Sequence, residues 1–232
     1  MFGEAKPMGL NAPYFWVNFK AYPGTAGGDG LALARTIERV QQETGVRFVL
    51  SPQTPDVRMI AEETDLAVMA QRADAVDAGR GMGVILPETV AAAGADALAI
   101  NHAEYRETLD DIATLIERCR DTGLHSVVSA HGLEAGRAAV TFEPDTIVFE
   151  VPADIATDRA ITQTHPDRVR EFVEMVREVT EHTHVFVGGG ISSSDDVAKA
   201  FELGADAVGA ASAVVGADDP YETLIDLATG FP

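Results

Sequence analysis

The sequence has one cysteine, Cys119, and only three lysines, Lys6, Lys20 and Lys199, among its 232 residues. A single cysteine cannot form a disulfide within the chain, so we expect a reducing compartment, the cytoplasm. Positive charge is also scarce: 17 Lys and Arg face 37 Asp and Glu, which gives a net charge of −20. Nucleic acids and anionic membranes are bound through basic surfaces, so this balance excludes both as partners.

Long apolar runs are missing as well. No stretch approaches the roughly 18 apolar residues of a membrane-spanning helix, and residues 1–13 lack the basic flank and apolar core of a signal peptide. We expect those residues to form an N-terminal tail. No cluster of Cys and His has the spacing of a metal site, so we expect no metal and no cofactor. What is present is a 46% hydrophobic content with 21 glycines, sufficient for a core without disulfides.

The excess of acidic residues has two explanations. One is adaptation to concentrated salt, where carboxylates retain water and the screening length shrinks to a few ångströms. The other is ordinary variation among acidic proteins. We favour the first, halophilic explanation, which concerns where the protein works rather than what it does.

Short runs rich in Val, Ile, Phe and Ala alternate with helical patterns along the whole chain. The expected strands are Phe15–Lys20, Arg47–Ser51, Leu66–Gln71, Ala97–Asn101, His125–Ala130, Thr146–Glu150, His184–Gly188 and Ala207–Ala210. The clearest expected helices are Leu31–Glu43, Glu107–Thr122, Asp167–Glu181 and Asp195–Leu203. Eight repeats without a linker predict an α/β fold, a single (β/α)8 TIM barrel over residues 14–232. The alternative, a doubly wound open sheet, usually carries a glycine-rich fingerprint after its first strand, which the sequence from Asn18 to Tyr22 does not have.

In such a barrel, functional groups lie at the C-terminal ends of the strands. The first expected strand ends in Asn18 and Lys20, two residues apart and therefore on the same side. The alternative for Lys20 is a surface lysine with a buried stem. The fourth strand runs into His102, ahead of a helix expected to start near Glu107. A helix N-terminus favours a neutral imidazole that can donate to a developing oxyanion, although His102 could also be a structural histidine.

Glu150 follows the largely apolar sixth strand, where a carboxylate is placed to act as a partly desolvated base. Its alternative role is an ion pair with Lys20 or Arg106. The seventh and eighth strands run into small residues that let backbone N–H groups approach an anion, at the recurrent phosphate site of this fold: Gly189, Gly190, Ala211 and Ser212. A base, a neutral donor, a cation and a phosphate cradle suit proton transfer next to a carbonyl on a small phosphorylated substrate.

These motifs resemble the triosephosphate isomerase family, in particular its short archaeal form, from Phe15 to about Leu227. The matching segments are Asn18-Phe19-Lys20, Asn101-His102-Ala103-Glu104-Tyr105-Arg106, Glu150-Val151-Pro152, Gly188–Ile191, Ala211–Val214 and Asp219-Pro220. The resemblance implies that Glu150 takes a proton from the carbon next to the carbonyl and that neutral His102 polarises this carbonyl. It also implies that Lys20 stabilises negative charge.

The same resemblance implies further contacts and an assembly. Asn18 would help to fix the substrate oxygen, Glu104 would orient the electrophilic end, and Ala156 would bind substrate from the lid. The implied activity is the interconversion of dihydroxyacetone phosphate and glyceraldehyde 3-phosphate in glycolysis and gluconeogenesis, in a homodimer or homotetramer.

The sequence departs from the family pattern at several places. The lid reads Ile155-Ala156-Thr157-Asp158 where the family has Ile-Gly-Thr-Gly, and Val151 and Ala103 replace the usual Pro and Ser. Met82 stands in the loop that reaches a neighbouring subunit in the family. His131 is an additional titratable group, either a new ligand contact or a loop histidine with local hydrogen bonds.

These departures keep other functions open. A paralogous isomerase could use the same chemistry on another sugar or sugar phosphate. A non-catalytic barrel could serve in binding or assembly, and other phosphate-binding barrels, such as synthases, share the last two loops. The retained Lys20, His102 and Glu150 favour the triose-phosphate isomerase.

Overall fold

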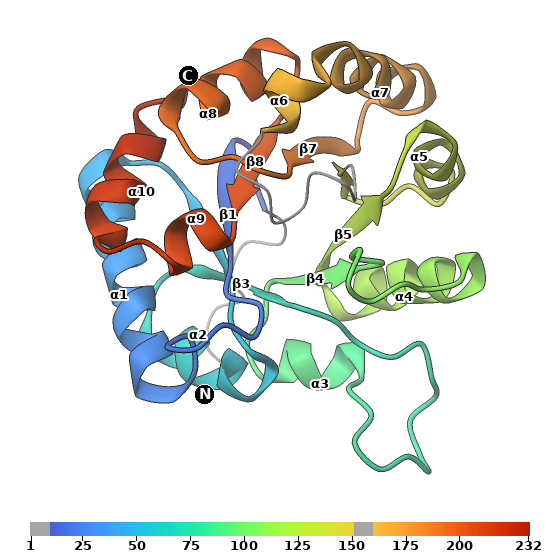
Figure 1. Cartoon of the computed structure of the whole chain (residues 1–232). Helices are drawn as coiled ribbons and strands as arrows, with labels where there is room; N and C mark the ends of the chain where they lie inside the picture. The colour runs from blue at the N-terminus through green and yellow to red at the C-terminus, as the bar shows by residue number, and fades with distance from the viewer. Residues whose placement is uncertain (1–9, 151–159) are drawn as a thin grey trace.

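The eight strands close a parallel barrel in chain order in a computed structural model that describes residues 10–150 and 160–232 (Figure 1). The strands are β1 (Tyr14–Asn18), β2 (Phe48–Ser51), β3 (Ala67–Ala70), β4 (Ala97–Ile100), β5 (His125–Ala130), β6 (Thr146–Phe149), β7 (His184–Gly188) and β8 (Ala207–Ala210). β8 pairs with β1, with Phe15 opposite Val208, and this pairing completes the closure. The predicted (β/α)8 barrel is confirmed.

Helices surround the barrel on its outside (Figure 1). They are α1 (Gly27–Thr44), α2 (Val57–Glu63), α3 (Pro87–Ala92), α4 (Leu109–Thr122), α5 (Leu133–Val140), α6 (Ile161–Thr164), α7 (Pro166–Val179), α8 (Ser194–Glu202), α9 (Ser212–Val215) and α10 (Pro220–Ala228), with a 3-10 turn, η1 (Thr54–Asp56), before α2. Side-chain oxygens cap α4, α8 and α10: Thr108 accepts from Asp111 N, Ser193 from Asp196 N, and Asp219 from Tyr221 N and Glu222 N. None of the helices that the structure describes is both long and apolar enough to cross a bilayer.

Side chains alternate between two apolar layers, as the twofold periodicity of a strand requires. On β1, Phe15 and Val17 face the helices, whereas Tyr14 and Trp16 face the inside of the barrel. The inner layer is filled by Leu10, Tyr14, Trp16, Val49, Met69, Ala97, Ala99, Val127, Val148, Phe186 and Ala207. The same alternation directs the residues that follow the strands into the barrel mouth.

Several element boundaries differ from the sequence prediction. β1 ends at Asn18, because Lys20 adopts a positive φ of 45° that no strand accommodates. β6 ends at Phe149, one residue before Glu150. α4 begins at Leu109 rather than near Glu107, since Thr108 supplies the cap. α1 begins at Gly27, four residues before Leu31, at glycines whose low helix propensity conceals the start.

Candidate active site

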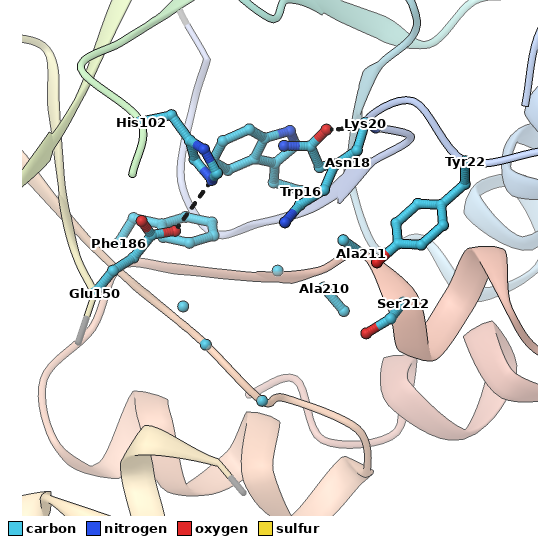
Figure 2. A pocket seen from close by; sticks show the side chains of 14 residues that line it. Trp16, Asn18, Lys20, Tyr22, His102, Glu150, Phe186, Ala210, Ala211 and Ser212 are labelled. Carbon is cyan, nitrogen blue, oxygen red and sulfur yellow. Dashed lines mark hydrogen bonds and ion pairs between the residues drawn. The ribbon is translucent and has the colours of Figure 1, made fainter. Parts of the chain in front are cut away.

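A cavity opens at the C-terminal ends of the strands (Figure 2). Its lining residues are Trp16, Asn18, Lys20, Tyr22, His102, Glu150, Phe186, Gly188, Gly189, Gly190, Gly209, Ala210, Ala211 and Ser212. The structure therefore brings together eight of the ten residues that the sequence singled out: Asn18, Lys20, His102, Glu150, Gly189, Gly190, Ala211 and Ser212. Glu104 lies beside the cavity, and Ala156 falls outside the described residues.

Glu150 is a buried carboxylate, only 7% exposed, at the end of β6. Its backbone N–H donates to the Ala130 carbonyl at 3.2 Å, which continues the β5–β6 ladder and fixes the start of its side chain. Oε1 lies 3.8 Å from His102 Nε2, and Oε2 has no hydrogen-bond partner among the described residues. Burial raises the pKa of Glu150 to about 7, and the positive charge of Lys20 only partly opposes this. Among the described residues Glu150 faces His102, and it makes no ion pair with Lys20 or Arg106, which the alternative role requires.

His102 faces Glu150 from the loop after β4 (Figure 2). Its Nδ1 accepts the backbone N–H of Glu104 at 3.2 Å, which places the imidazole proton on Nε2, toward the cavity. Burial first, and Lys20 second, lower the pKa of His102 to about 4, so the ring is neutral at pH 7. The sequence prediction of a neutral imidazole agrees with this. Burial and Lys20 are its causes here, and α4 begins at Leu109 rather than near Glu107.

Lys20 enters the cavity from a strained backbone position. Its backbone N–H donates to Asn18 Oδ1 at 2.8 Å, and its carbonyl accepts from Gln71 Nε2 at 3.0 Å. These bonds hold the left-handed conformation that a residue with a Cβ otherwise avoids. The side chain is only 15% exposed, so the surface-lysine alternative does not describe it.

The Glu104 carboxylate lies close to both Lys20 and His102. Its Oε1 lies 3.2 Å from Lys20 Nζ, and its Oε2 lies 3.6 Å from His102 Nδ1. It lines a neighbouring hollow rather than the cavity itself. The carboxylate can therefore orient Lys20, while the Glu104 backbone N–H holds His102 Nδ1, and neither needs to touch a molecule bound in the cavity.

The loops after β7 and β8 form the opposite wall. Gly189 and Gly190 have φ values of 112° and 71°, which favour glycine. A Cβ on Gly209 would lie 2.3 Å from the Trp16 carbonyl oxygen, so only glycine fits there. Behind the β7 loop, the buried Asp196 carboxylate accepts the backbone N–H of Ser192 and of Ser193, each at 3.1 Å. This wall is therefore built of small residues, and the Asp196 hydrogen bonds hold the loop after β7 in place.

Three aromatic residues of the cavity escaped the sequence analysis. The Trp16 indole N–H donates to Ser51 Oγ at 2.8 Å, and its ring packs edge-on against Phe186 at 5.5 Å between centroids, forming a floor. The hydroxyl of Tyr22 points toward Ala211 and Ser212 (Figure 2). The inward position of Trp16 could have been found, because it lies two residues before Asn18 on the same strand face.

Other predicted features lie elsewhere. His131 does not line the cavity, and its Nε2 bonds instead to the Asn101 carbonyl at 3.0 Å, which is the local role. The lid departures Ile155, Thr157 and Asp158, and also Val151, fall outside the described residues. In residues 10–150 and 160–232, no group of three or more His, Cys, Asp or Glu side chains could hold a metal.

Comparisons with known proteins agree with this geometry. The sequence profile of the family described as triosephosphate isomerase matches residues 13–228. A curated triosephosphate isomerase of Methanopyrus kandleri is 41% identical over 223 residues, which is 95% of this chain and 99% of that protein. Those of Methanobacterium bryantii and Sulfolobus acidocaldarius are 38% and 34% identical, over 93% and 94% of this chain and 95% and 94% of their own lengths.

Proposed function

Because the chain belongs to the triosephosphate isomerase family, we propose that Glu150, His102 and Lys20 carry out its reaction. The protein is an isomerase that interconverts dihydroxyacetone phosphate and glyceraldehyde 3-phosphate, the activity for which the family and these relatives are named. The reaction moves one proton between two adjacent carbons through an enediolate. The observation that carries the assignment is the buried Glu150 carboxylate, which faces a neutral histidine and whose Oε2 has no hydrogen-bond partner among the described residues.

Glu150 is the base. Ionised Glu150 takes the proton from the carbon next to the substrate carbonyl and returns it to the neighbouring carbon. A pKa raised to about 7 by burial makes this carboxylate a stronger base than one in water, while it still ionises near neutral pH. Within residues 10–150 and 160–232, Oε2 makes no hydrogen bond that would have to break before it accepts the proton.

His102 and Lys20 stabilise the charge that develops on oxygen. The Nε2–H of neutral His102 donates to the carbonyl oxygen as the proton leaves carbon, and the imidazole then moves protons between the two oxygens of the enediolate. The Lys20 ammonium supplies a fixed positive charge in a poorly solvated site, where it acts more strongly than in water. Asn18 holds the Lys20 backbone in place.

The phosphate lies against the opposite wall. Gly189, Gly190, Ala211 and Ser212 line that side of the cavity, where their backbone N–H groups would bind the phosphate, and the Tyr22 hydroxyl faces this side (Figure 2). A net charge of −20 repels an anionic substrate at long range, so binding depends on these neutral donors and Lys20 at short range. The family resemblance adds Ala156 as a further substrate-binding residue, which lies outside the described residues.

The assembly is a homodimer or homotetramer that works in the cytoplasm, with one domain per chain over residues 14–232. Within the expected tail of residues 1–13, Leu10 packs into the inner layer of the barrel. The segment between β3 and α3 extends away from the barrel (Figure 1), and its Met82 is fully exposed. Beside Lys20 and Glu104 lies a hollow of about 210 Å³. We propose that the projecting segment of a second copy inserts into this hollow. We expect Met82→Asp to dissociate the assembly, which light scattering of wild type and variant measures.

A related isomerase acting on a longer sugar fits the site less well, because Trp16 and Phe186 close the cavity floor. A barrel that only binds ligands has no need of a base, so the free-energy cost of burying the Glu150 carboxylate would have no function there. The test is turnover of glyceraldehyde 3-phosphate by the purified chain in a coupled assay in molar salt. A four-carbon aldose phosphate is assayed separately as the alternative substrate. A well-folded protein that turns over neither substrate overturns the proposal.

A further inference from the structure

The residue before His102 has an unusual backbone. Asn101 directly follows β4 and has a φ of 59°, in the left-handed region. Asparagine tolerates this region better than most residues, but the conformation persists only where surrounding contacts hold it. The direction of the His102 side chain depends on the peptide plane that Asn101 shares with it. What holds Asn101 therefore decides where the imidazole points.

Glu107 holds Asn101 on its N–H side. The Glu107 carboxylate accepts the Asn101 backbone N–H, and the Glu107 backbone N–H donates to Asn101 Oδ1 at 3.0 Å. Burial raises the pKa of this carboxyl to about 7, and the Asn101 hydrogen bond opposes the rise. The proposed isomerase reaction does not use this partly buried acid. Its contacts in the structure are the hydrogen bonds to Asn101.

His131 holds Asn101 on its carbonyl side. His131 Nε2 lies 3.0 Å from the Asn101 carbonyl oxygen, which can only accept, so Nε2 carries the proton. Nδ1 is buried without a hydrogen-bond partner among the described residues, and burial lowers the pKa of the ring, so it is neutral. The Asn101 side-chain amide also donates to the Ser129 carbonyl at 2.9 Å. Both peptide groups that flank Asn101 are thereby anchored.

We propose that Glu107 and His131 are positioning residues for the reaction, which clamp the Asn101 backbone in its left-handed conformation and so aim His102 Nε2 at the substrate carbonyl. This inference rests on the proposed role of His102. Rotation of the released peptide would swing the imidazole, and a displacement of about 1 Å at a reacting group costs on the order of a hundredfold in rate. Neither residue needs to touch the substrate.

The test replaces each residue by Gln and by Met, which have similar lengths. In His131→Gln the amide still donates to Asn101, and in Glu107→Gln the amide oxygen still accepts from it, whereas both Met variants lose the bond. We expect each Met variant to lower kcat by roughly ten- to a hundredfold with KM changed less than about twofold. Each Gln variant should recover most of that loss. His182→Met, an exposed histidine far from the barrel mouth, is the control and should leave kcat unchanged.

A second measurement separates this inference from the proposed function. The nitrogen chemical shifts of the His102 imidazole report its Nε2–H tautomer without any turnover. We expect the wild-type signature in the Gln variants and a shift toward averaged tautomers in the Met variants. Met variants with wild-type kcat and wild-type shifts would overturn the clamp, as would Gln and Met variants that lose activity equally. Inactive wild type with the expected shifts would overturn only the proposed function.

Discussion

His102 Nε2 lies 3.8 Å from Glu150 Oε1 at the mouth of the barrel. This separation is longer than a hydrogen bond, so neither group is committed to the other, and each remains available to a substrate. Burial shifts the pKa values of Glu150 and His102 in opposite directions, and both shifts favour the neutral form of the side chain. It raises the pKa of Glu150 to about 7 and lowers that of His102 to about 4, and so disfavours charge on both.

The pH dependence of the reaction follows from that pair. Glu150 must be ionised to accept a proton, whereas His102 stays neutral throughout the range above its pKa of about 4. We expect kcat/KM to rise with pH and to level off above a midpoint near 7. Because the substrate phosphate also titrates near pH 6, inhibition by inorganic phosphate serves as the control. A kcat/KM that is flat from about pH 5 to 8 would contradict the assignment.

Glu150 should also destabilise the folded protein at high pH. Its folded pKa of about 7 exceeds the ordinary value of 4.5 for a glutamate, so the folded state binds the proton more tightly than the unfolded chain. Stability therefore falls as pH rises between these values, by up to about 3 kcal/mol at 1.36 kcal/mol for each pKa unit. We expect Glu150→Gln to raise the free energy of unfolding near pH 8 and to have little effect near pH 4. Denaturant titration at both pH values measures this, and an equal effect at both would refute it.

Tyr22 provides a test of the phosphate end of the site. Its hydroxyl points toward Ala211 and Ser212 (Figure 2), and no hydrogen bond ties it to another described side chain. We expect Tyr22→Phe to raise KM for glyceraldehyde 3-phosphate and the inhibition constant of inorganic phosphate by about five- to tenfold, with kcat nearly unchanged. Tyr221→Phe is the matched control, because that hydroxyl bonds to Glu43 on the surface. Unaltered phosphate inhibition in Tyr22→Phe would place the phosphate elsewhere.

The net charge of −20 predicts the response to salt. Repulsion between the protein and an anionic substrate is screened within a few ångströms in molar salt, while the short contacts inside the cavity are screened much less. We expect activity to persist or rise as potassium chloride is increased to about 2 M. Steady-state kinetics with circular dichroism on the same samples measure this. Steep inhibition without loss of folded signal would contradict the expectation.

The barrel and the order of its elements were predictable, because periodicity and composition distinguish buried parallel strands from amphipathic helices. The alternation of β1 placed Asn18 correctly on the inner face. Lys20 was expected at the strand end for the same reason, but it reaches the cavity by a left-handed turn that the side chains of Asn18 and Gln71 stabilise. The contact from Gln71, which is 51 residues from Lys20 in sequence, is not visible in a local pattern.

The supporting residues were harder to predict than those of the reaction itself. Glu107 and His131 show no motif, and only the fold brings them to the two sides of Asn101. The neutral state of His102 was expected from the start of a helix, whereas burial and Lys20 are its causes. A pKa depends on how completely a group is buried, which requires the packed structure rather than the sequence.

The most direct test of the central claim is hydrogen exchange with solvent during turnover in D2O. Starting from dihydroxyacetone phosphate, wild-type protein should yield glyceraldehyde 3-phosphate labelled with deuterium at C2, because the Glu150 carboxyl exchanges its proton with solvent. Glu150→Gln should slow both labelling and turnover by about 10²–10⁴-fold, and Glu150→Asp, which shortens the side chain by one carbon, by on the order of a hundredfold. A Glu150→Gln variant that labels C2 at the wild-type rate would show that another group removes the proton.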